Sequence, residues 1–132
     1  MDEENVEMVR RAFEAYVGGD VQAILGFIDP DLEWTYLDPS EADPEPRVCH
    51  GRHELEVALH KQADRGLMSE LEEVIGHGDH VVVVLRTPGI DAHRMRKTDD
   101  RDYDVVTVEH GRIAALKACR TLDDALALAG SA

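Results

Sequence analysis

Asp38 stands where a carboxylate could carry out proton-transfer chemistry. Apolar and polar residues alternate from Leu32 onward, which is typical of a half-buried strand. Trp34 and Tyr36 fall on the same face of that strand as Asp38. Loss of hydration beside aromatic rings raises the pKa of a carboxyl group and suits it to act as a general base. The alternative interpretation is an ordinary turn, because Pro39 follows directly.

Prolines and acidic residues dominate the next segment, from Asp38 to Arg47. Such a composition can neither continue a sheet nor form a helix. We interpret the segment as a loop, and a lid over a pocket is one role open to it.

Three histidines, His50, His53 and His60, have spacings that invite a metal-site interpretation. No carboxylate partners stand at matching spacing, so we predict no metal site and no cofactor. The two cysteines, Cys49 and Cys119, form no CxxC pair. We predict that they are small buried residues that stay reduced.

The charge balance argues against one class of partner. Asp and Glu number 28 against 14 Lys and Arg, which gives a formal net charge of −14. Such a chain repels polyanions at long range, so we expect no nucleic-acid partner. No stretch reaches the about 20 apolar residues that span a bilayer, and Met1–Glu4 lacks the pattern of a signal peptide. We therefore expect a cytoplasmic protein with no membrane partner.

Four helices are predicted from apolar residues at three- and four-residue steps. Asp20 and Thr121 are the expected N-terminal caps of the second and the last helix. The expected ends are Gly18–Gly19 for the first helix, Asp29–Pro30 for the second, Gly66 for the third and Gly130 for the last.

Five strands are predicted, over residues 32–36, 71–75, 81–85, 103–108 and 113–118. Glycine-containing turns at 76–80 and 109–111 join neighbouring strands into antiparallel hairpins. Helices followed by a meander indicate an α+β fold. A chain of 132 residues builds one core, so we expect a single domain over residues 1–132.

The order of the elements and three short blocks resemble the SnoaL-like branch of the nuclear transport factor 2-like superfamily. The resemblance implies a cone-shaped, curved antiparallel half-barrel with three N-terminal-half helices over a pocket and a short C-terminal helix. It also implies a small-molecule ligand and a homodimer paired across the sheet, in a family of enzymes and non-enzymes. The blocks are Asn5–Ala15 with Gly19–Asp20 and Asp29–Trp34, Gly78–Asp79 with Val81–Val84, and Val105–Val108 with Gly111–Ile113 and Ala125–Gly130.

Two places in the sequence are similar to ketosteroid isomerase, a member of that superfamily. Asp38, upstream of His50–Arg52, matches the arrangement around that enzyme's general base. Asp104, ahead of His110–Ile113, matches its protonated aspartate, which donates a hydrogen bond to the substrate oxygen. The resemblance therefore implies that Asp38 and Asp104 are catalytic.

Two departures from that enzyme change the expected site. Ala12 occupies the place of the tyrosine that shares its oxyanion site, and Tyr16 lies one turn beyond. Arg120 replaces an apolar pocket residue, so it either pairs with Asp104 or favours a polar or anionic ligand group. The residues expected to contact a ligand are Phe13, Tyr16, Trp34, Tyr36, Leu59, Val106, Leu116, Ala118 and Arg120.

Three functions are compatible with this sequence. The first is an isomerase, cyclase or hydrolase-like enzyme that uses aspartate acid/base chemistry and no cofactor. The second is a non-catalytic protein that binds a small ligand in the same pocket. The third is a dimerisation module whose pocket is filled by side chains. Thr107, Ala115 and Cys119 favour a homodimer through the outer face of the sheet, because a fully solvated face would carry more charge.

Overall fold

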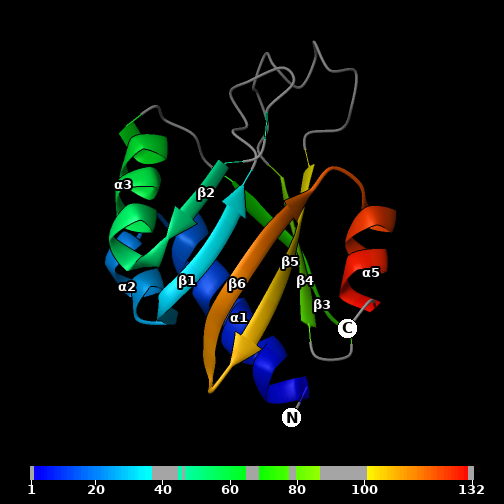
Figure 1. Ribbon diagram of the computed structural model, residues 1–132. Coiled ribbons are helices and arrows are strands. Elements are labelled where there is room, and N and C mark those ends of the chain that lie inside the picture. Colours follow the sequence, from blue (N-terminus) through cyan, green and yellow to red (C-terminus); the bar gives the residue numbers. More distant parts are fainter. Residues whose placement is uncertain are drawn as a thin grey trace.

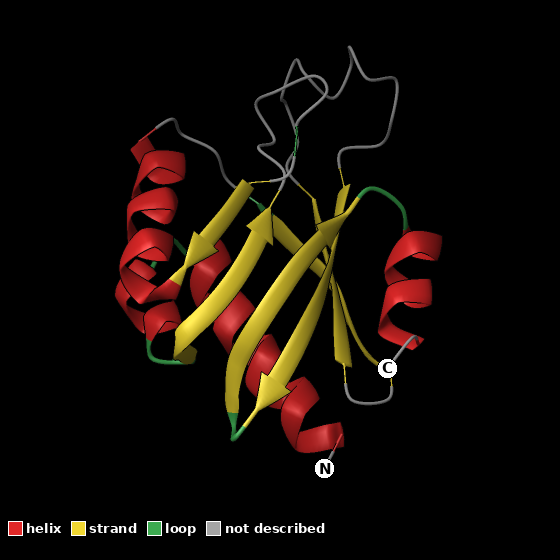
Figure 2. Ribbon diagram, in the orientation of Figure 1, coloured by secondary structure: helices red, strands yellow, loops and turns green. Residues whose placement is uncertain are grey.

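The computed structural model of the chain describes residues 2–36, 45, 47–64, 69–77, 80–86 and 101–130. Four helices and six strands lie in this part of the chain (Figures 1 and 2). In chain order they are α1 (Asp2–Val17), α2 (Val21–Leu25), β1 (Ile28–Tyr36), β2 (Arg47–His50), α3 (Gly51–Asp64), β3 (Glu70–His77), β4 (His80–Arg86), β5 (Arg101–Glu109), β6 (Arg112–Cys119) and α5 (Leu122–Gly130).

The strands form one curved, open sheet in the order β2-β1-β6-β5-β4-β3. Strands β3 to β6 are a meander of antiparallel neighbours, which confirms the predicted pairing. Strand β1 differs, because it runs parallel to β6, with Trp34 opposite Leu116. The sheet is therefore mixed and not antiparallel throughout. Local patterns could not reveal this pairing, since the two strands stand near opposite ends of the sequence.

Helices cover both faces of the sheet (Figure 1). The inner face, as we name it, is crossed by α1, which packs on β3, while α3 packs on β1 and β2. The opposite, outer face carries α5, which packs on β4 and β5. This arrangement confirms the expected α+β cone. Among the described residues, no helix is long and apolar enough to cross a membrane.

Two apolar clusters correspond to the two faces. The inner cluster joins α1 and α3 to the sheet, and it includes Phe13, Trp34, Leu59, Val106 and Leu116. The outer cluster joins α5 to the sheet and contains Val82, Val84, Tyr103, Val105, Ala125 and Ala129. Alternation along β4 and β5 sends neighbouring residues to opposite clusters, as the two-residue period of a strand requires.

The second helix is shorter than predicted. Asp20 caps it, accepting a hydrogen bond from the backbone N–H of Ala23 at 3.0 Å, but the helix ends at Leu25. Ile28 continues the helical spacing, yet it is fully buried as the first residue of β1. The register against β6 shifts between Ile28 and Glu33, and Pro30 falls in this irregular stretch, where a strand tolerates proline.

Strand β2 was not predicted, because it is short and carries little pattern. Its four residues pair with β1 at the edge of the sheet, and Cys49 is the buried one among them. Helix α3 begins directly afterwards at Gly51, whose φ of 81° places it in the left-handed region. A Cβ there would lie 3.2 Å from the Pro30 carbonyl oxygen, so glycine suits the junction.

Several predictions lie outside the described residues. They include Asp38, nearly all of the segment to Arg47, the centre of the 76–80 turn, and the end of the third helix at Gly66.

Candidate functional site

Asp104 is the buried charged side chain of the described core, with 5% of its surface exposed. It lies in β5 between Tyr103 and Val105, which both belong to the outer cluster. Alternation therefore directs Asp104 to the inner face, where its strand neighbours are Val83 and Ala118. A carboxyl group in this position has exchanged water for an apolar surrounding.

That surrounding favours the neutral form of the Asp104 carboxyl group. Burial is the larger cause and raises its pKa well above the usual value, because a buried charge loses its hydration. The negative charge of Asp102 raises the pKa further. Asp104 is thus suited to donate a hydrogen bond as a carboxylic acid.

Tyr16, in the last turn of α1, brings a second hydroxyl group to this place. Its pKa is also raised, first by burial and next by the charge of Asp104. A hydrogen bond to the Ser69 side chain acts in the opposite direction, and the more weakly felt charge of Asp102 raises the pKa again. Two proton-bearing oxygens, one phenolic and one carboxylic, therefore belong to one electrostatic cluster.

A row of aromatic rings leads from Tyr16 to the sheet. Phe13 meets Tyr16 edge-on, with ring centroids 6.1 Å apart and planes at 71°. Phe13 also stacks on Trp34 of β1, with centroids 6.1 Å apart and planes at 28°. Phe13 is completely buried, so it fixes the positions of both neighbours.

The remaining residues predicted to contact a ligand fall into two groups. Leu59, Val106 and Leu116 are at most 6% exposed and belong to the inner cluster. Ala118 and Tyr36 are half-buried; Ala118 lies opposite Asp104, and Tyr36 ends β1 and packs on the inner cluster.

Arg120 is placed differently from the other predicted residues. It lies in the bend after β6 and is exposed. The causes that raise the pKa of Asp104 are burial, which is the larger, and the charge of Asp102. The structure thus brings together Phe13, Tyr16, Trp34 and Asp104, while the predicted base, Asp38, lies outside the described residues.

Sequence reasoning missed two members of this cluster, Ser69 and Asp102. Asp102 could have been found, because it stands two residues before Asp104 and shares its strand face. Ser69 carried no such signal, since it precedes β3 and meets Tyr16 through the packing of α1 on that strand.

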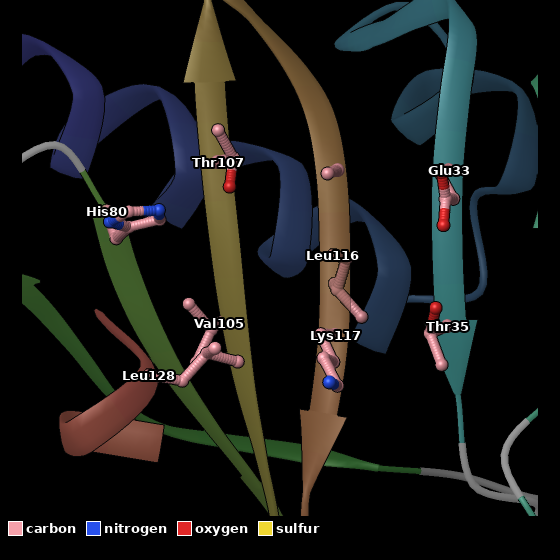
Figure 3. A pocket seen from close by; sticks show the side chains of 9 residues that line it. Glu33, Thr35, His80, Val105, Thr107, Leu116, Lys117 and Leu128 are labelled. Atoms are coloured by element: carbon pink, nitrogen blue, oxygen red, sulfur yellow. The ribbon is translucent and has the colours of Figure 1, made fainter. Parts of the chain in front are cut away.

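The outer face has a hollow of about 380 Å³ beside α5 (Figure 3). Two charged side chains, Glu33 and Lys117, stand over adjacent strands at one side of it. At the other side, His80 has its Nδ1 atom buried without a hydrogen-bond partner among the described residues. The hollow is lined by Glu33, Thr35, His80, Val105, Thr107, Ala115, Leu116, Lys117 and Leu128.

Metal-binding groups do not converge in the part of the chain that the structure describes, where no set of three or more His, Cys, Asp or Glu side chains could hold an ion. His50, His53 and His60 are all exposed. His60 lies 3.9 Å from the Glu56 carboxylate, an ordinary contact one helical turn apart.

Solved structures of the same fold define the class of this protein. A proposed polyketide cyclase from Sinorhizobium meliloti has a TM-score of 0.66 and 19% identity, over 86% of this chain and 94% of that one. An NTF2-like protein of unknown function from Burkholderia pseudomallei has a TM-score of 0.63 and 19% identity, over 97% and 98%. A proposed polyketide cyclase from Xanthomonas campestris has a TM-score of 0.62 and 16% identity, over 97% and 98%. The fold is that of the nuclear transport factor 2-like superfamily.

Within this class the family is also clear. The sequence profile of the SnoaL-like domain matches residues 9–116, so the chain belongs to the SnoaL-like domain family. No curated protein matches the chain.

Proposed function

We propose that the inner site binds a small molecule through a carbonyl oxygen and that the protein is a cyclase or isomerase working by acid/base chemistry. The observation that carries the proposal is the shared cluster of Asp104 and Tyr16, both of which favour their protonated forms. Two donors aimed at one oxygen stabilise the negative charge that develops when a carbonyl compound enolises. The two proposed polyketide cyclases of the same fold support this reaction class.

The reaction begins with removal of a proton from the carbon next to the carbonyl group. In our proposal Asp38 takes that proton; its role comes from the sequence resemblance. The C–H electrons form a C=C bond, and the carbonyl π electrons move to the oxygen. The Asp104 carboxyl and the Tyr16 hydroxyl then donate hydrogen bonds to this oxygen. Return of the proton from Asp38 to a different carbon completes an isomerisation. In a cyclisation the enolate carbon attacks a second carbonyl carbon, and the oxygen of that carbonyl takes the proton from Asp38.

The apolar residues of the inner cluster give the site its walls in this proposal. Trp34 and Tyr36 of β1 both belong to or pack on the inner cluster, and they offer aromatic surface to a ring-bearing ligand. Ala118 leaves room beside Asp104, because its side chain is small. Arg120 is assigned to the rim and not to the oxyanion site, since it is exposed.

Hydrogen–deuterium exchange next to a carbonyl group tests the proposal without knowledge of the natural substrate. A panel of neutral cyclic ketones is incubated with the protein in D₂O, and deuterium uptake is followed by proton NMR. We expect catalysed uptake, with a loss of about a hundredfold or more in Asp104→Ala and Tyr16→Phe. Glu109→Gln is the matched control, because Glu109 is exposed at the far end of the same strand.

The result also separates an enzyme from a binding protein. Saturable ketone binding that depends on Asp104 and Tyr16, without deuterium uptake, would replace the enzyme by a non-catalytic binding protein. If no ketone of the panel shows either binding or deuterium uptake, the proposal is wrong.

We also propose a homodimer formed through the outer face. The hollow there is bordered by small or uncharged residues, Thr35, Thr107 and Ala115, next to opposite charges on Glu33 and Lys117. A two-fold axis over β1 and β6 would allow Lys117 of each copy to face Glu33 of the other, which makes the surface self-complementary.

Sedimentation velocity tests this dimer. Lys117→Glu should weaken association, and the double exchange Glu33→Lys with Lys117→Glu should restore it. A wild-type monomer at about tens of micromolar would contradict the proposal, since a standard interface persists at that concentration. A cytoplasmic location stays a prediction from the sequence.

A further inference from the structure

Asp102 is an inward carboxylate that the proposed mechanism leaves without a role. It stands two residues before Asp104 in β5, so both side chains project from the same face of the strand. Its cross-strand neighbour is Leu85, a buried member of the inner cluster. Asp102 is itself half-buried, so its charge acts on the inner site through little water.

The neighbouring arginine forms an ion pair with an acid of β3. Arg101 precedes Asp102, and alternation directs it to the outer face. There its guanidinium group forms a hydrogen-bonded ion pair with Glu72 of β3. Arg86, opposite Arg101 in the register, lies 3.7 Å from the Glu70 carboxylate. The cations at this end of β4 and β5 thus pair with acids of β3.

We propose that Asp102 is a positioning residue of the inner site, whose carboxylate keeps the proton on Asp104 so that Asp104 and Tyr16 both present donors to one ligand oxygen. The inference rests on the proposed function, and it adds a residue that the resemblance does not supply. Its basis is the shared strand face, the apolar surroundings and the convergence on Tyr16.

Among the described residues, the titratable groups electrostatically linked to Asp104 come from three elements. Asp102 comes from its own strand, Tyr16 from α1, and Cys119 from β6 senses the Asp104 charge from the outer side. The residues across from Asp104, Val83 on β4 and Ala118 on β6, are apolar. Asp102 is therefore the described carboxylate whose negative charge favours the protonated form of Asp104.

The size of the effect follows from electrostatics. Alternate residues of a strand stand about 6.6 Å apart. At an effective dielectric constant of about 20, two like charges at this distance change an acid dissociation constant by about tenfold or more. Replacing Asp102 by a neutral residue should therefore let Asp104 lose its proton at lower pH.

Carbon-13 NMR titration of the carboxyl groups tests the inference directly, with the Asp104 signal assigned by its loss in Asp104→Asn. In Asp102→Asn the Asp104 midpoint should move to lower pH, by about tenfold in the dissociation constant. Asp102→Glu should stay close to the wild type, and Glu109→Gln should not move it. If Asp102→Asn fails to fold, Asp102→Ser removes the same charge with a smaller side chain.

Binding of 4-nitrophenol, followed by the absorbance of its phenolate, links the titration to the site. Its oxygen resembles an enolate oxygen, so the upper pH limit of binding should fall in Asp102→Asn and return in Asp102→Glu. An unchanged Asp104 midpoint in Asp102→Asn overturns the role of Asp102, even where binding still requires Asp104 and Tyr16. If replacing Asp104 or Tyr16 does not change 4-nitrophenol binding, the proposed function is wrong. The Asp104 midpoint from NMR then still decides the role of Asp102.

Discussion

Replacing Asp104 by asparagine should raise the free energy of unfolding at neutral pH. The gain over the wild type should be smaller in acid. The two side chains have nearly the same shape, but asparagine does not ionise. In the folded protein, burial and the charge of Asp102 oppose ionisation of Asp104. In the unfolded chain, Asp104 ionises at the ordinary aspartate pKa of about 3.9. Ionisation of Asp104 therefore lowers the free energy of unfolding of the wild type as the pH rises, and the asparagine variant lacks this contribution.

The expected size follows from proton linkage. Below the unfolded pKa both states hold the proton, so the carboxyl group has its full stabilising effect there. As the pH rises above that value, the unfolded chain releases the proton while the folded protein keeps it. The free energy of unfolding then falls by about 1.4 kcal/mol for each pH unit. The fall ends where the folded carboxyl group itself ionises, which lies well above the ordinary value.

Urea unfolding followed by Trp34 fluorescence measures this effect, because Trp34 is the single tryptophan of the chain and is buried. The free energy of Asp104→Asn minus that of the wild type is recorded from about pH 4 to about pH 8. The difference should rise by about 1.4 kcal/mol per pH unit and then level off. Any fixed cost of the amide shifts the whole curve and leaves its slope unchanged.

Glu109→Gln supplies the matched control, because it exchanges an exposed carboxyl group on the same strand. Its difference curve should stay nearly flat. A flat curve for Asp104→Asn, or one that falls with pH, would refute the reasoning, since the folded carboxyl group would then ionise as easily as the unfolded one.

Three further changes test the packing of α1 on the sheet and the cap of α5. Phe13→Ala should cost about 3–5 kcal/mol in urea unfolding and quench the catalysed deuterium uptake, because Phe13 is fully buried between Tyr16 and the sheet. Gly76→Ala should cost about 1–3 kcal/mol in the same assay, since the new Cβ would lie 2.8 Å from Cγ2 of Val6 and push α1 away from β3. Thr121→Ala should lower the thermal midpoint at a cost of about 0.5–2 kcal/mol, because the Thr121 hydroxyl accepts the 3.1 Å hydrogen bond that caps α5.

Much of the fold could be predicted because its elements carry strong periodic patterns. Val9 and Phe13 are fully buried, and Val6, Tyr16 and Val17 on the same predicted face of α1 are partly buried. The meander from β3 to β6 follows from alternation and short turns. The predicted end of α2 was wrong. Ile28 fits a helical stripe and a strand equally well, and tertiary packing decides between them. Strand β2 has too few residues to show any period.

The candidate site was predictable only where strand phase or resemblance reached it. Asp104, which the resemblance singled out, lies on the inner face opposite Ala118. Tyr16 lies in its electrostatic surroundings, one helical turn from the position that the resemblance implied. Ser69 could not be predicted, because its hydrogen bond to Tyr16 depends on how α1 lies across the sheet. The exposure of Arg120 could not be predicted either. Strand β6 ends at Cys119, so the alternation that would direct residue 120 inward stops before it.

The parallel pairing of β1 with β6 has a consequence for the order of folding events. These strands span residues 28–36 and 112–119, so the centre of the sheet joins segments separated by most of the chain. The chain entropy lost on closing so long a loop delays such a pairing, whereas the β3 to β6 hairpins need only short loops or one longer connection. The meander should therefore collapse first and wait for the N-terminal strand to dock along its free edge at β6. Trp34 packs against α1 from β1, so its fluorescence would report this late docking step and not the earlier assembly of the hairpins.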